Sequence, residues 1–214
     1  TEGPIVKAKS SFILSSRRTY IDILTRPFIK NLPAAGSGYY FYDLNAKFNH
    51  RFNEKDEVFL SGYFGRDVFT FQNSNMGFGT NIPWGNAMGS FRWNHLFNDK
   101  LFLNVNTTYS DYDFSFEGRQ EGFAFGFDSG IEDWNLKWQL SYYPSSRHKI
   151  KAGVDYVYHQ FLPLSYYMII DGDQTQLGTE GVSDETHSHE SGFYFEDEFD
   201  LTEKIKLYGG LRYS

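Results

Sequence analysis

The residues from Tyr40 to Phe64 alternate between apolar and polar side chains with a period of two. Apolar side chains, with His50 among them, occupy the even positions of the first run from Tyr40 to Phe52, and mostly polar side chains lie between them. This period is typical of a β-strand whose two faces meet different surroundings. The joint at 53–56 is short and polar, so the second run is expected to return antiparallel to the first.

Similar hairpins recur along almost the whole chain. We expect about nine strands, near residues 8–17, 38–52, 57–71, 84–97, 101–116, 134–142, 150–159, 193–201 and 207–213. Residues 19–24 are expected to form a helical turn that Pro27 stops, and no helix longer than a turn or two is predicted.

The predicted connections alternate in length. Those at residues 53–56, 98–100, 144–148 and 201–204 are tight, whereas those at 18–37, 72–83, 117–122 and 162–190 are longer. Short periplasmic turns at one end and longer extracellular loops at the other are typical of outer-membrane barrels. We therefore expect the tight turns on the periplasmic side, and residues 163–189 to be the least ordered segment.

The composition strengthens this interpretation. Aromatic residues make up 20% of the chain although its mean hydropathy is only -0.51, as expected where aromatic girdles alternate with polar positions. No apolar run is long enough for a transmembrane helix. The net charge of -7 disfavours nucleic acid as a partner, and the absence of Cys excludes disulfides and thiolate sites. The predicted fold is an all-β, antiparallel, up-and-down transmembrane β-barrel segment; the alternative is a soluble or surface-displayed β-sandwich that binds carbohydrate.

Several segments resemble a known family. The first of them, Gly3–Ile5 followed by Lys9–Leu24, resembles a mid-barrel segment of TonB-dependent outer-membrane receptors, of the kind with an N-terminal carboxypeptidase-regulatory-like domain. Two more, Phe41–Asn45 and Phe193–Ser214, look like strands of the same family. The resemblance covers essentially the whole chain. It implies a 22-stranded barrel in a Gram-negative outer membrane that holds a plug domain. Such a receptor imports a nutrient (an oligosaccharide, a siderophore or similar) with energy from an inner-membrane protein that contacts the plug, and is not an enzyme.

The chain departs from the family pattern in lacking a plug, a TonB-contacting segment, a terminal Phe and most of the strands. We therefore expect residues 1–214 to be a partial barrel domain of a longer receptor, whose substrate the sequence does not identify. The polar strand positions are predicted to line its lumen. They are Asp43, Asn45, Lys47, Asn49, Arg51, Asn104, Asn106, Lys137, Gln139, Lys151 and Asp155.

No catalytic, cofactor or metal site is predicted. Glu196 and Glu198 would share one strand face while Asp197 points away, which suits a hydrated wall better than catalysis. His187, His189 and Glu190 are weighed as metal ligands, and Asp171-Gly172-Asp173 as part of a calcium loop, but both patterns are incomplete. No Gly-x-Ser-x-Gly motif marks a nucleophile, which argues against an outer-membrane lipase.

Four aromatic residues in predicted loops leave two interpretations open. They are Phe78, Trp84, Tyr166 and Tyr167. Their rings are suited either to stacking on a sugar or siderophore, or to anchoring at a membrane interface.

Overall fold

The computed structural model describes residues 1–170, 173–177 and 186–214, and most of them are in strands. The strands are β1 (Glu2–Val6), β2 (Ser10–Arg18), β3 (Gly38–Arg51), β4 (Asp56–Asn73), β5 (Phe78–Asn98), β6 (Leu101–Gln120), β7 (Phe123–Tyr142), β8 (His148–Ile170), β9 (Asp173–Leu177), β10 (Thr186–Thr202) and β11 (Ile205–Tyr213). One helix occurs among these residues, α1 (Ile21–Ile29).

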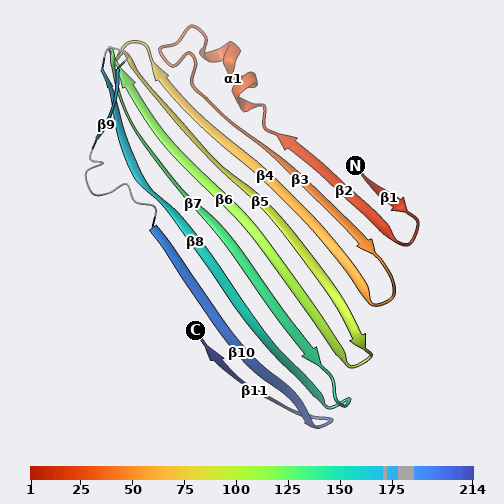
Figure 1. Ribbon diagram of the computed structural model, residues 1–214. Coiled ribbons are helices and arrows are strands. Elements are labelled where there is room, and N and C mark those ends of the chain that lie inside the picture. Colours follow the sequence, from red (N-terminus) through yellow and green to blue (C-terminus); the bar gives the residue numbers. More distant parts are fainter. Residues whose placement is uncertain (171–172, 178–185) are drawn as a thin grey trace.

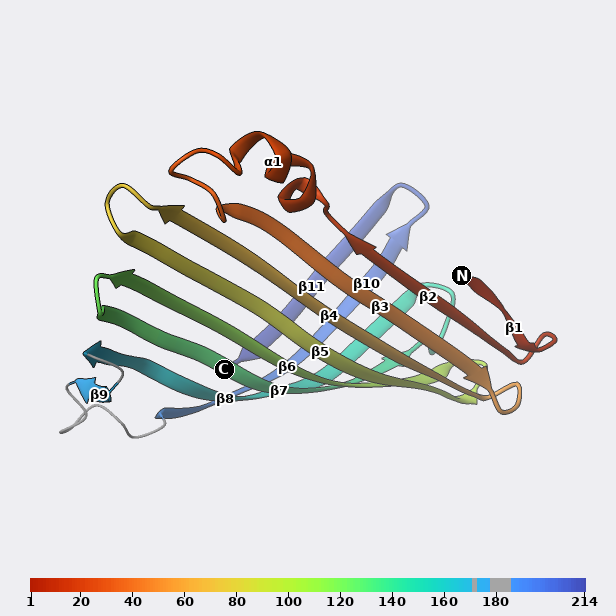
Figure 2. The same ribbon diagram turned by 90° about the horizontal axis from the view of Figure 1, so that it is seen from above.

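All strands join one antiparallel sheet in which neighbours along the chain are neighbours in space, in the order β1 to β8, then β10 and β11. β9 pairs with the last residues of β8, beyond the part of β8 that pairs with β10. The sheet is long and curved (Figures 1 and 2). We call the end at which α1 lies the upper end and the opposite end the lower end. The predicted up-and-down antiparallel architecture is confirmed.

The four predicted tight turns all lie at the lower end, and each begins with a side chain that caps the turn. Asn53 Oδ1 accepts hydrogen bonds from the backbone N–H groups of Lys55 (2.7 Å) and Asp56 (2.9 Å). Asn98, Ser145 and Thr202 accept equivalent bonds in the other three turns. Asn, Ser and Thr favour turns because they can bond the backbone in this way. These residues set the register of their hairpins locally.

The sheet is a single layer without a conventional core. In the described part of the chain, elements contact only their neighbours in the sheet, apart from α1 against β3. Ala124 is the one buried hydrophobic residue of that part. A β-sandwich buries one face of each sheet against the other, so the sandwich alternative receives no support.

Strand number and connections differ from the prediction. The described ranges form eleven strands rather than about nine, because β1 and β9 were not expected. β1 is an edge strand, where Pro4 is tolerated because its missing N–H faces away from β2.

Two predicted long loops are tight turns. Residues 72–83 and 117–122 belong largely to strands, and only 74–77 and 121–122 connect them. The predicted excursion over 162–190 also begins and ends inside strands, since β8 reaches Ile170 and β10 starts at Thr186. The expected disorder of that connection falls partly on residues 171–172 and 178–185, outside the described residues.

The helix is longer than predicted. α1 has nine residues and contains Pro27, which was expected to stop it. Pro27 lies in the last turn, where its missing N–H removes one intrahelical bond, and the bond from Lys30 N–H to Arg26 O (3.1 Å) closes the helix beyond it. In the described residues, no helix is long and apolar enough to cross a membrane.

Candidate functional site

The pairing register assigns every strand residue to one of two faces. Asp43 pairs with Gly65 and Leu44 with Phe64, and the alternation continues from strand to strand through β11. Because successive side chains point to opposite faces, we name the two sides the Asp43 face and the Leu44 face.

The Leu44 face carries a continuous apolar band. On β7 it runs from Trp134 to Tyr142, and Glu132 ends it. This stretch is nine residues long, which matches the length that a tilted strand needs to cross the hydrocarbon of a membrane. Its side chains are uncovered: Trp138 is 53% exposed and Leu207 50%. A face of this kind requires an apolar medium.

Aromatic rings border the band above and below. At its upper edge Tyr109 and Trp134 pack with ring centroids 4.9 Å apart. At its lower edge His95 packs against Phe97 at 4.5 Å and bonds Asp56 at 2.6 Å. Amphipathic rings at two levels separated by apolar side chains are typical of the interfaces of a membrane protein.

The polarity of both faces inverts above the band. On the Leu44 face, Arg66 reaches across Gly85 to form an ion pair with Asp113 (3.1 Å), and Asp111 and Glu132 are close by in sequence and register. Charged residues here indicate that the upper strands extend beyond the apolar medium.

The register places all eleven predicted lumen residues on the Asp43 face. Asp43 itself is only 6% exposed and forms an ion pair with Arg17 at 2.5 Å. Asn104 donates to Asn94 at 2.5 Å, and Asn106 to Thr108 at 3.2 Å. Whether this face borders an aqueous lumen remains a prediction.

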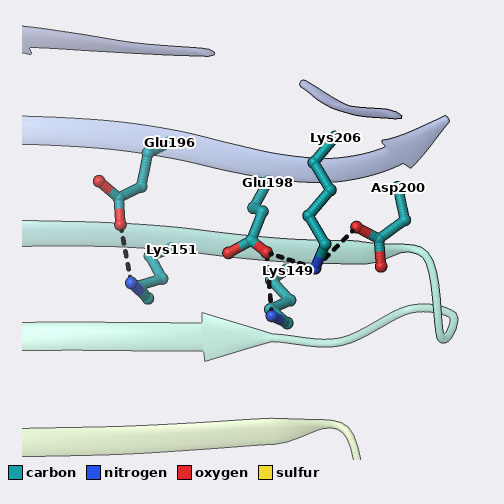
Figure 3. Close-up of polar contacts among 6 residues, drawn as sticks. All are labelled: Lys149, Lys151, Glu196, Glu198, Asp200 and Lys206. Carbon is teal, nitrogen blue, oxygen red and sulfur yellow. Dashed lines mark hydrogen bonds and ion pairs between the residues drawn. The ribbon is translucent and has the colours of Figure 1, made fainter. Parts of the chain in front are cut away.

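The lower part of the Asp43 face carries a ladder of ion pairs (Figure 3). Glu196 pairs with Lys151 (3.0 Å), and Glu198 with Lys149 (3.0 Å) and Lys206 (3.4 Å). Lys206 also reaches Asp200 at 3.2 Å. Three carboxylates thus meet three ammonium groups, so the ladder neutralises itself. As predicted, Asp197 lies on the other face, where it bonds His148 at 2.7 Å.

A recess of about 450 Å³ adjoins the upper end of this ladder. Two cations that line it share a carboxylate, since Asp155 lies 3.4 Å from Lys137 and 3.5 Å from Arg212. Tyr194 donates a 2.8 Å hydrogen bond to Gln139. A larger recess of about 810 Å³ lies at the lower end and is lined by Arg51 and Asn104 among others. The smaller recess presents Lys137, Gln139, Glu196 and Arg212 and suits a hydrogen-bonding partner, whereas the larger one is lined by apolar as well as polar side chains.

The upper part of the Asp43 face carries an aromatic surface, which we define by the residues Tyr39, Trp84, Phe114, Phe116, Phe127 and Tyr166. Tyr39 and Trp84 stack with centroids 6.3 Å apart, and Phe116 stacks on Phe127 at 5.3 Å. Phe127 also packs against Phe114 (5.8 Å) and Tyr166 (6.0 Å). Sequence reasoning placed four of these rings near the ends of predicted strands, left Phe127 unassigned and put Tyr166 in a loop, and it missed that they form one surface.

The four aromatic residues left open by the sequence fall on different faces. Phe78, Trp84 and Tyr166 lie on the Asp43 face, whereas Tyr167 lies on the Leu44 face over Gly126 and bonds Glu117 (3.2 Å). All four lie above the apolar band, so none of them is at the membrane interface defined by Tyr109 and Trp134.

His187 and His189, which the sequence offered as candidate metal ligands, form hydrogen bonds with tyrosines instead. The hydroxyl of Tyr156 lies 2.8 Å from Nδ1 of His189, and that of Tyr158 lies 2.8 Å from Nδ1 of His187. Glu190 lies on the opposite face, 3.8 Å from His159. Within the described ranges no group of three or more His, Asp or Glu side chains is placed to hold a metal ion. Asp171 and Gly172 of the candidate calcium loop lie outside those ranges.

Comparison with known proteins identifies the architecture. Residues 22–214 match the family described as "TonB dependent receptor-like, beta-barrel". A search of curated proteins finds no significant match. Among solved structures, the chain is similar to the ferric preacinetobactin receptor BauA of Acinetobacter baumannii, with TM-score 0.65, 11% identity and coverage of 99% of this chain and 37% of that one.

Two further receptors share the fold. The ferric yersiniabactin uptake receptor FyuA of Yersinia pestis has TM-score 0.59 and 10% identity, over 95% of this chain and 34% of that one. The open form of the ferric-catecholate import receptor Fiu of E. coli K12 has TM-score 0.61 and 6% identity, over 97% and 44%. The chain therefore spans between a third and a half of the length of these three solved receptors.

Proposed function

The chain belongs to the β-barrel family of TonB-dependent receptors, a family of Gram-negative outer-membrane proteins, and from this membership we propose that it forms part of the wall of a barrel that imports a nutrient. The observation that carries the proposal is the contrast between the two faces at one height. On β7, Leu136 and Trp138 belong to the uncovered apolar band, while Lys137 and Gln139 between them bear charge and hydrogen bonds.

In this proposal the Leu44 face contacts lipid and the Asp43 face borders the barrel interior. A barrel of the large, 22-stranded kind holds a plug domain, and the polar recess beside the ion-pair ladder on the Asp43 face suits contacts with such a domain. Lys137 and Arg212 share Asp155 as their carboxylate partner, so an acidic group on the plug would complete their pairing. The inner-membrane energy-transducing protein would act through the plug. Residues 1–214 would be one portion of the barrel domain of this receptor.

The transported compound would be an oligosaccharide, a siderophore or another nutrient too large for open diffusion. The test is uptake by cells that carry the whole receptor or lack it. We expect uptake of at least one labelled oligosaccharide or ferric siderophore to require the receptor and to stop when the proton-motive force is dissipated. Binding to the cell surface should persist in de-energised cells. Receptor-dependent uptake that continues without the proton-motive force would indicate passive diffusion and overturn the proposal.

A further inference from the structure

The aromatic surface is neither a packed core nor part of the lipid contact. No described element covers the Asp43 face, and Tyr166 is 40% exposed. Trp84 precedes Gly85, where Arg66 and Asp113 pair on the opposite face, so this part of the sheet has already left the apolar band. Large uncovered aromatic patches usually mark a binding surface. An occupant must therefore meet these rings from the side that would be the barrel interior.

Carboxylates lie beside the rings. The hydroxyl of Tyr39 donates to Asp67 at 2.5 Å, which holds the Tyr39 ring against Trp84. Further along the same face, Asp133 bonds His159 at 2.6 Å, and Glu190 lies on the other side of that histidine. A wholly apolar occupant would remove water from the remaining acceptor sites of these carboxylates, which is costly.

The charge balance discriminates between classes of ligand. Among the side chains that the structure describes on the Asp43 face above the pairing row that joins Lys47 to Glu190, those of Asp, Glu, Lys, Arg and His comprise three carboxylates and two potential cations. The carboxylates are Asp43, Asp67 and Asp133, and the potential cations are Arg17 and His159. An anionic ferric complex would be repelled by this excess of negative charge. A neutral compound would not be repelled, and its hydroxyl groups could donate hydrogen bonds to the carboxylates.

We propose that the aromatic surface is the binding site for a neutral oligosaccharide, with Trp84 and Tyr39 as its stacking platform and Asp67 as a hydroxyl acceptor. Saturated sugar rings present flat C–H faces that pack on aromatic rings, and their hydroxyl groups satisfy neighbouring carboxylates. The inference rests on the proposed import function and narrows its substrate class. It also separates this chain from receptors whose names specify ferric siderophores.

The experiment measures binding to the whole receptor in detergent by calorimetry. The probes are linear gluco-, xylo- and manno-oligosaccharides and a ferric tris-catecholate. We expect at least one oligosaccharide to bind, and Trp84→Leu to weaken its binding tenfold or more. Tyr39→Leu should weaken it as well. Trp134→Leu, which removes a Trp from the Leu44 face, should leave the affinity unchanged. Asp67→Asn should reduce oligosaccharide affinity several-fold, whereas the same change would improve binding of an anionic complex.

Two outcomes would overturn the inference. One is binding of the ferric complex alone, strengthened by Asp67→Asn. The other is a folded receptor that binds none of the oligosaccharides, or binds one equally well with Trp84→Leu and Tyr39→Leu; resistance of the barrel to heat-dependent unfolding in gels reports folding. Energised uptake of the ferric complex without oligosaccharide binding would reject this substrate class while leaving the import function intact. Loss of all energised uptake would instead count against the import function.

Discussion

The ring of Tyr194 on β10 lies over Gly153 on β8, and its hydroxyl reaches β7 to bond Gln139 at 2.8 Å. A Cβ added at Gly153 would lie 2.4 Å from two atoms of the Tyr194 ring. The glycine therefore allows one side chain to connect three strands on the Asp43 face, which makes the position sensitive to a single methyl group.

We expect Gly153→Ala in the whole receptor to destabilise the barrel by about 1–3 kcal/mol, because the ring must move and its bond to Gln139 is lost. Gly89 on β5 is the matched control, since an added Cβ there meets nothing within 4 Å. Gly89→Ala should be neutral or stabilise by about 0.4–1 kcal/mol through the unfolded chain. Denaturant unfolding from bilayers measures both. Equal losses for the two variants would contradict the role of the Tyr194 contact.

A second prediction concerns the different surroundings of the two faces of β7, lipid on one side and the barrel interior on the other. Leu136→Arg would put a charge on the Leu44 face within the apolar band, at a cost of roughly 2–4 kcal/mol near the middle of the membrane. Asn135→Arg puts the same charge at nearly the same height on the Asp43 face, where hydration should keep the cost small. The same unfolding measurement compares them. If Asn135→Arg were as harmful as Leu136→Arg, the assignment of the faces to lipid and interior would be wrong.

A third prediction concerns the ion-pair ladder. Glu198 contacts both Lys149 and Lys206, but all three are solvated, so Glu198→Gln should lower the unfolding midpoint only slightly and only at low salt. The difference from the parent receptor should vanish at molar salt. A loss that persists at high salt would show that the ladder is shielded from solvent, as it would be beneath a tightly seated plug.

A fourth prediction concerns orientation. Residues 1–214 contain no Cys, so a cysteine introduced here is the only one in this portion, and any cysteine elsewhere in the whole receptor is replaced by serine first. A membrane-impermeant maleimide added to intact cells should label Lys30→Cys beside α1 and spare Lys55→Cys and Lys100→Cys in the lower turns. Disrupting the outer membrane should make the two lower sites reactive, which serves as the control. Surface labelling at the lower turns of intact cells would invert the proposed topology.

The local pattern of the sequence determined the strands that cross the apolar band and the turns that join them below. Within the band the alternation is strong because one face must be apolar and the other polar, and β7 from Trp134 to Tyr142 shows it without interruption. Asn53, Asn98, Ser145 and Thr202 begin the lower turns through bonds made within two or three residues. Periodicity and turn chemistry act over such short distances, so both can be recognised in a sequence.

Only the tertiary structure decided what happens above the band. There the strands leave the apolar medium, the faces exchange character, and Asn- and Gly-containing segments such as 72–83 no longer look like strands although they pair as strands. The rings of Tyr39 and Trp84 are 45 positions apart in sequence (84 minus 39) and meet because β3, β4 and β5 align their registers. The aromatic surface, and the carboxylates beside it, arise from pairing between strands. No property of one segment predicts such a surface, because each ring reaches its neighbours only after the sheet has formed.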